Sequence, residues 1–175
     1  MKKRGMKEGG IQLYDYFLKP GYIFVSREPA IISSVLGSCV AVTLWDSREQ
    51  YGGMAQYLYP SIEEAERATA RYGNAALNHL AKMFFEGGAA RKDLLAQIFG
   101  GASLSEETLY VSEDNIRIAR QILNQLEIRI VSEDVGGGMG RKLIYNTLTN
   151  EAVVYRANKL RKGDWYPYIH DSQRE

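Results

Sequence analysis

Short apolar runs recur along the chain, and they constrain its fold more than any other feature of the sequence. Each run spans only a few residues, is rich in β-branched and aromatic side chains, and stops at a glycine, a proline or a polar turn, as β-strands do. We expect strands at residues 22–25, 31–36, 40–45, 54–59, 95–99, 128–131, 142–146 and 152–155. Turn residues between neighbouring runs, such as Arg27 to Pro29 and Thr149-Asn150, favour antiparallel strands joined by tight connections.

Two stretches have helical periodicity instead. The first is expected to begin at Ser61, a good N-cap residue, and to stop at Gly87, and the second follows Ser112. In each, apolar residues recur at steps of three and four and so share one face: Ala65, Ala68, Tyr72, Ala76, Leu80 and Met83, and then Ile116, Ala119, Leu123 and Leu126. The sequence therefore predicts the α+β class, with two helices covering one face of a mainly antiparallel sheet system.

The length of 175 residues suits one domain with a sizeable core. We expect a single domain over residues 1–175, with its core at about 12–160, an N-terminal arm of ten residues and a C-terminal tail from Arg161. Lys and Arg number 22 against 21 Asp and Glu, so the basic excess typical of nucleic-acid binding is missing, and no nucleic-acid partner is expected.

The location expected from the sequence is the cytoplasm. No apolar run approaches the roughly 20 residues of a membrane-spanning helix. The basic N-terminus is not followed by the apolar stretch of a signal peptide. We therefore expect no membrane insertion.

Cys39 is the only cysteine, which excludes an internal disulfide and a metal site built from several thiolates. It ends the sequence Leu36-Gly37-Ser38-Cys39, directly after an expected strand, where Gly37 permits a sharp turn with backbone N–H groups near the sulfur. Such groups lower the pKa of a thiol and stabilise an oxyanion on a substrate carbonyl. A lone intracellular cysteine is more often a small buried hydrophobic residue, and composition alone favours that interpretation.

A cysteine nucleophile needs a base, and the chain has two histidines. His79 lies in the first expected helix, one position off its apolar face, and His170 lies in the tail. The glycine-rich run from Gly136 to Arg141 lacks the Gly-Lys-Ser/Thr of a phosphate loop and precedes a strand instead of a helix. We interpret it as a turn of positive-φ glycines and expect neither a metal nor an organic cofactor.

Several motifs together resemble the CheD family of chemoreceptor glutamine deamidases. In family order over about residues 20 to 157, they are Pro20-Gly21, Leu36-Gly37-Ser38-Cys39-Val40-Ala41-Val42, Asp46, Gly52-Gly53-Met54-Ala55, Pro60, Gly100-Gly101-Ala102, Asn115-Ile116, Glu133-Asp134-Val135-Gly136-Gly137 and Gly140-Arg141-Lys142. The resemblance implies a layered α/β/β sandwich, and it implies hydrolysis of glutamine side chains on chemoreceptor cytoplasmic helices to glutamate.

The resemblance also implies roles for five residues. Cys39 matches the family's nucleophile, which forms a thioester with the substrate, and Gly37 and Ser38 lie where substrate and oxyanion bind. The family's hydroxyl residue, six positions before the cysteine, falls on Ser33. Its histidine, seventeen positions after the cysteine, falls on Gln56.

Gln56 leaves two hypotheses open. A histidine can take and return a proton, whereas an amide only donates and accepts hydrogen bonds, and loss of a general acid–base costs on the order of 10²–10⁴ in rate. The first hypothesis is a deamidase with Cys39 as nucleophile and Gln56 at the base position, whose activity is weak or is rescued by another group such as His79 or His170. The second is a catalytically impaired homologue that binds a CheC-type phosphatase, a partner that the family implies, or receptor helices.

Overall fold

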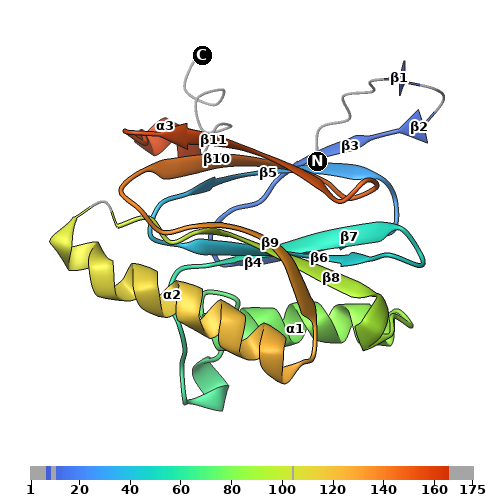
Figure 1. Cartoon of the computed structure of the whole chain (residues 1–175), viewed down its shortest axis with the longest axis horizontal. Helices are drawn as coiled ribbons and strands as arrows, with labels where there is room; N and C mark the ends of the chain where they lie inside the picture. Colours follow the sequence, from blue (N-terminus) through green and yellow to red (C-terminus); the bar gives the residue numbers. More distant parts are fainter. Residues whose placement is uncertain (1–6, 9–10, 104, 166–175) are drawn as a thin grey trace, which may run out of the picture.

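The computed structural model describes residues 7–8, 11–103 and 105–165, and they form three layers (Figure 1). Helices α1 (Gly73–Glu86) and α2 (Glu106–Gln125) cover one face of a five-stranded sheet. A four-stranded sheet packs on the opposite face. The α+β class and the layered sandwich with two helices on one face are confirmed.

The five-stranded sheet is antiparallel except for its last pair, β8 and β9. In spatial order its strands are β4 (Tyr22–Ser26), β7 (Tyr51–Tyr57), β6 (Val40–Asp46), β8 (Leu94–Gly100) and β9 (Arg129–Val135). The three middle strands are buried along almost their whole length, because helices lie on one side of them and a second sheet on the other.

The four-stranded sheet is antiparallel except for the pair β3 and β5. In spatial order its strands are β11 (Glu151–Ala157), β10 (Gly140–Asn146), β5 (Ala30–Leu36) and β3 (Tyr14–Phe17). The smaller elements are β1 (Lys7–Glu8) and β2 (Ile11–Gln12), which pair with each other, the 3₁₀ turns η1 (Ala65–Arg67) and η2 (Arg91–Asp93), and the short helix α3 (Lys162–Trp165).

Two separate cores hold the layers together. Alternate residues of β6 face opposite sides of their sheet: Val40, Val42 and Leu44 pack under the helices with Leu80 and Phe84. The other face of the sheet supplies the core between the two sheets, which contains Leu36, Cys39, Ala41, Met54, Phe99, Leu143 and Tyr145. Cys39 is thus part of the inter-sheet core.

The chain crosses between the sheets more often than the turn signals indicate. The turn at Arg27 to Pro29 does join β4 to β5, but these strands lie in different sheets. The segment Gly37 to Cys39 crosses back from β5 to β6. The expectation of antiparallel neighbours at these two connections is wrong, since a short turn carries the chain to a second layer as readily as to an adjacent strand.

The helix boundaries also differ from the expected ones. α1 begins at Gly73, twelve residues after Ser61, because the intervening charged segment is largely exposed and Tyr72 is extended. α2 begins earlier than expected, at a capping box formed by Ser105 and Thr108. Among the described helices, none is both long enough and apolar enough to cross a membrane.

Two glycines with positive φ provide a matched test of the packing at the sheet crossing. A Cβ on Gly100 (φ +103°) would lie 2.4 Å from the carbonyl oxygen of Cys39, whereas a Cβ on Gly88 (φ +93°) would meet nothing within 4 Å. Gly88→Ala therefore costs only backbone strain, about 1 kcal/mol. Gly100→Ala adds a backbone clash and is expected to cost about 3 kcal/mol or more. Urea unfolding of both variants measures the difference, and equal losses of stability would contradict this account.

Candidate active site

Cys39 lies at one end of the sandwich, where three connections are stacked. The carbonyl oxygen of Cys39 accepts a hydrogen bond from the Gly101 amide at 2.8 Å, and that of Gly37 accepts one from Ala102 at 2.8 Å. The Gly136 amide donates to the Gly100 carbonyl at 2.9 Å. In Figure 1 these connections meet at the left-hand end, beside the segment that enters α2. The backbone around Cys39 is therefore fixed from the side of β8 and the β9–β10 loop.

The Gln56 amide reaches the sulfur of Cys39. Gln56 lies on β7, is 0% exposed, and donates from Nε2 to Cys39 Sγ at 3.2 Å and to the Val35 carbonyl at 2.9 Å. Its Oε1 accepts a hydrogen bond from Ser34 Oγ at 2.5 Å. Both amide hydrogens and the amide oxygen have partners, so the Gln56 side chain is held in one orientation beside the thiol.

The surroundings keep the Cys39 thiol protonated near neutral pH. Burial raises the pKa of Cys39 above its ordinary value of 9.0, because a thiolate is poorly solvated in the inter-sheet core. Hydrogen bonds from the Gln56 side chain and from the backbone of Gly37 and Cys39 lower the pKa but only in part offset burial. The site thus has groups that favour a thiolate, in surroundings that disfavour any charge.

The two adjacent serines of β5 face opposite sides of the four-stranded sheet. Ser34 is buried and faces Gln56, and its single hydroxyl hydrogen is shared between Gln56 Oε1 and the Leu18 carbonyl, 3.2 Å away. Ser33 pairs laterally with Phe17 and Ile144 and, by strand alternation, faces the outer surface of the sheet. The structure therefore brings Ser34, Gln56 and Cys39 together and places the Ser33 side chain on the other face. A serine pair gives no sequence signal that distinguishes the two positions.

Asn115 of α2 fixes the outer side of the cysteine loop. Its Nδ2 donates to the Ser38 carbonyl at 3.0 Å and to the Leu58 carbonyl at 2.9 Å, while the Tyr57 hydroxyl donates to the Asn115 carbonyl. Asn115 is 0% exposed, and its Oδ1 is buried without a partner among the described residues. Asn115 belongs to one of the motifs that resemble the CheD family, but its role at the site is not predictable from the sequence, since no spacing pattern connects it to Cys39.

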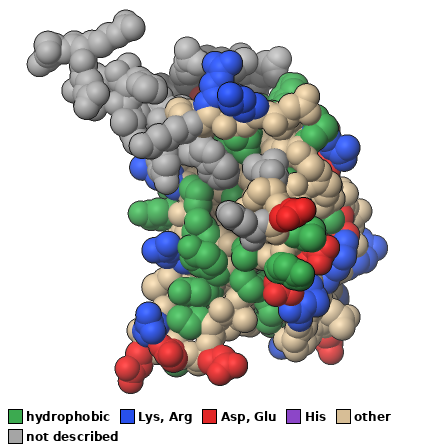
Figure 2. Space-filling view, turned by 90° about the vertical axis from the view of Figure 1, so that its left-hand side faces the viewer, with side chains coloured by type: hydrophobic (Ala, Val, Ile, Leu, Met, Phe, Trp, Pro, Cys, Tyr) green, Lys and Arg blue, Asp and Glu red, His purple; other side chains and the backbone are tan. Residues whose placement is uncertain are grey.

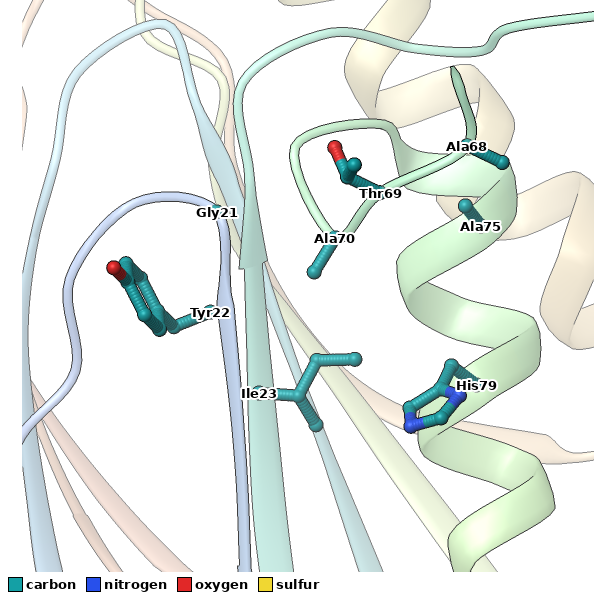
Figure 3. A pocket seen from close by; sticks show the side chains of 8 residues that line it. All are labelled: Gly21, Tyr22, Ile23, Ala68, Thr69, Ala70, Ala75 and His79. Atoms are coloured by element: carbon teal, nitrogen blue, oxygen red, sulfur yellow. The ribbon is translucent and has the colours of Figure 1, made fainter. Parts of the chain in front are cut away.

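Of the two histidines, only His79 lies within the described residues, and it lies away from Cys39. His79 is exposed and projects from α1 toward Ile23 across an open groove of about 460 Å³, whose other walls are Tyr22 and the loop 68–70 (Figure 3). This groove lies beside β4 on the helix side of the five-stranded sheet, whereas Cys39 packs on the opposite face of that sheet. His170 lies outside the described residues.

The glycine-rich run forms a turn and not a phosphate loop. Gly136 and Gly137 have φ values of +72° and +71°, and the run leads into β10, not into a helix. No group of three or more His, Cys, Asp or Glu side chains within the described residues is arranged to hold a metal ion. The turn interpretation is confirmed for Gly136 to Met139, whereas Gly140 and Arg141 already belong to β10.

The raised pKa of Cys39 predicts how its thiol reacts. Since Cys39 is the only cysteine, the rate of alkylation by iodoacetamide as a function of pH reports this group alone. The rate for the native protein is expected to be still rising at pH 9.0, the ordinary pKa of the group, because only the thiolate reacts. The same protein in denaturant is the control and should level off earlier. A native rate that levels off below pH 8 would show that the thiolate is stabilised instead.

The comparisons with known proteins agree with the motifs. Residues 59–156 match the family model described as CheD chemotactic sensory transduction. A probable chemoreceptor glutamine deamidase CheD of Trichlorobacter lovleyi is 38% identical over 156 residues, which cover 87% of this chain and 97% of that protein. A protein of the same name from Sulfurimonas denitrificans is 40% identical over 131 residues, covering 73% and 84%. The chain belongs to the CheD family.

Proposed function

We propose that this protein is a chemoreceptor glutamine deamidase, with Cys39 as its nucleophile. The observation that carries the proposal is the Gln56 amide 3.2 Å from the sulfur of Cys39, a residue at the end of a crossing whose backbone is bonded on both sides. The curated relatives are named for the same activity. The reaction needs a substrate carbonyl that the sulfur can reach, a sulfur nucleophile and water, and it needs no cofactor.

The reaction proceeds in two steps, formation of a thioester and its hydrolysis. Cys39 Sγ forms a bond to the carboxamide carbon of a substrate glutamine, the thiol proton passes to the amide nitrogen, and ammonia leaves. Water then cleaves the resulting thioester, which yields a glutamate side chain and regenerates the thiol. The backbone N–H groups near the sulfur, in the segment of Gly37 and Ser38, stabilise the oxyanion that forms on the substrate carbonyl.

Gln56 fills the position of the family's histidine as an orienting group. Its Nε2 hydrogen bond partly lowers the pKa of Cys39, but the amide cannot take up a proton. Proton transfer from sulfur to the leaving nitrogen therefore lacks a side-chain base among the groups bonded to Cys39, and turnover is expected to be slow.

The partner proposed for the reaction is a chemoreceptor cytoplasmic helix, and the proposed compartment is the cytoplasm, where a lone thiol stays reduced. A second candidate function is binding without turnover, to a CheC-type phosphatase or to receptor helices. It is favoured by the raised pKa of the thiol and by Gln56 in place of a general acid–base.

Mass spectrometry of a receptor cytoplasmic fragment tests both candidates. Incubation with the wild-type protein is expected to convert glutamine to glutamate, and Cys39→Ala is expected to abolish the conversion. Gln56→His is expected to raise the rate by about 10²-fold or more, since it restores a general acid–base. Conversion by Gln56→His alone, with none above background by wild type, would reject turnover and favour the binding role. Thermal unfolding of each variant verifies that it is folded.

The adjacent serines supply a second, matched test. Ser34→Ala removes the partner of Gln56 Oε1, so it is expected to destabilise the fold by about 1–2 kcal/mol and to slow deamidation. Ser33→Ala changes a half-buried side chain on the other face and is expected to leave stability within about 0.5 kcal/mol. If Ser33→Ala alone slows deamidation, the hydroxyl role belongs to Ser33, as the family resemblance implies.

A further inference from the structure

Two arginines, Arg141 and Arg156, share the Asp134 carboxylate at the Cys39 end of the molecule. Arg141 is 2% exposed and donates to Asp134 Oδ1 and to the carbonyls of Met139 and Gly136. Arg141 therefore neutralises the Asp134 carboxylate and closes the turn between β9 and β10. Arg156 donates to the same Asp134 oxygen from Nη2 alone, at 2.9 Å.

The charges of Asp134, Arg141 and Arg156 do not cancel, and the exposed group among them is Arg156. Burial disfavours a charged Asp134, but hydrogen bonds from Arg156 and Arg141 outweigh burial and lower its pKa, so this carboxylate is ionised at neutral pH. Among the described residues, two guanidinium groups bonded to one carboxylate leave one positive charge uncompensated. The Arg156 side chain is 59% exposed, and its Nε and Nη1 bond to no other described residue.

These groups line an open depression of about 170 Å³, formed by Val135 to Met139 with Arg141 and Arg156. Gly136 and Gly137, which line the depression, have positive φ and no Cβ, so an incoming side chain can approach their backbone closely. Viewed onto this end of the molecule, Figure 2 shows basic side chains at the top and along both sides, and acidic side chains only in the middle and lower parts of the view. The depression has the size and charge for a carboxylate.

Two strand registers place the depression near Cys39. Leu36, Arg141 and Arg156 are paired in sequence across β5, β10 and β11. Val40, Gly100 and Val135 are paired across β6, β8 and β9. With strands about 4.8 Å apart, each route covers roughly 10 Å from Leu36 or Val40, which flank the crossing that carries Cys39, to a residue that lines the depression. On a helix this separation corresponds to about seven residues, or two turns, at 1.5 Å per residue.

We infer that the depression around Arg156 is a substrate subsite, which binds an Asp or Glu side chain about two helical turns from the target glutamine. The inference rests on the proposed function for the identity of the reacting residue and the helical form of the substrate. Arg156 then acts on specificity: it selects glutamines that have an acidic neighbour at this spacing, and it touches no reacting atom.

Binding to the Cys39→Ala variant tests the subsite without turnover. The probes are three fluorescein-labelled, alanine-rich helical peptides, each with one glutamine. The first has a Glu seven residues before the glutamine, the second has a Glu seven residues after it, and the third has Ala at both positions. Fluorescence anisotropy is expected to show about fivefold tighter binding of one Glu peptide than of the Ala peptide. Added salt should reduce the preference, because the contact is exposed.

Charge variants assign the preference to Arg156. Adding Arg156→Gln to the Cys39→Ala variant is expected to abolish the preference for the Glu peptide, and adding Arg156→Lys is expected to keep part of it. Arg129→Gln is the matched control: it removes one exposed charge at the other end of β9 and should leave the preference unchanged. Equal or undetectable binding of all three peptides, or a preference that survives Arg156→Gln, overturns the inference. A preference for Glu without deamidation by wild type would reject the proposed function and leave the subsite standing.

Discussion

The close backbone contact between Gly100 and Cys39 is the constraint on which the rest of the site depends. A Cβ at position 100 would lie 2.4 Å from the Cys39 carbonyl oxygen, and φ there is +103°, so only glycine fits this position. This contact lets β8 end against the crossing from β5 to β6, so that Gly101 and Ala102 bond to Cys39 and Gly37. One glycine thus joins the sheet crossing to the loop that carries the depression around Arg156.

A buried polar network lies beside this contact and sets the chemistry. Ser34, Gln56 and Cys39 are nearly or completely buried, and burying them is tolerable only because each polar group is bonded. Gln56 uses two donors and one acceptor at once. Burial keeps the thiol neutral, and the hydrogen bond from Gln56 offsets this only in part. The network therefore contributes mainly by fixing the position of the nucleophile.

Periodicity predicted the class, eight of the strands, the core face of α2 and part of that of α1, namely Ala76 and Leu80, because these depend on local patterns of burial. It missed β3, whose four residues are only partly buried, and it placed the start of α1 at Ser61, because small apolar residues in an exposed segment imitate a helix face. The choice of Cys39 and Gln56 followed from motif spacing. Ser34, Asn115 and Arg156 could not be selected, since each meets the site through strand pairing or helix packing between residues far apart in the sequence.

The same network explains why glutamine is stable at position 56. A neutral imidazole has one donor and one acceptor, whereas the surroundings offer two acceptors, the Val35 carbonyl and the Cys39 sulfur, and one donor, the Ser34 hydroxyl. A histidine in this pocket would leave one partner unbonded, at a cost of about 1–3 kcal/mol. Ser34 and Gln56 are therefore matched to each other. The site therefore differs from one built around a base. The hydrogen bonds that would orient a histidine here hold an amide, which cannot transfer a proton.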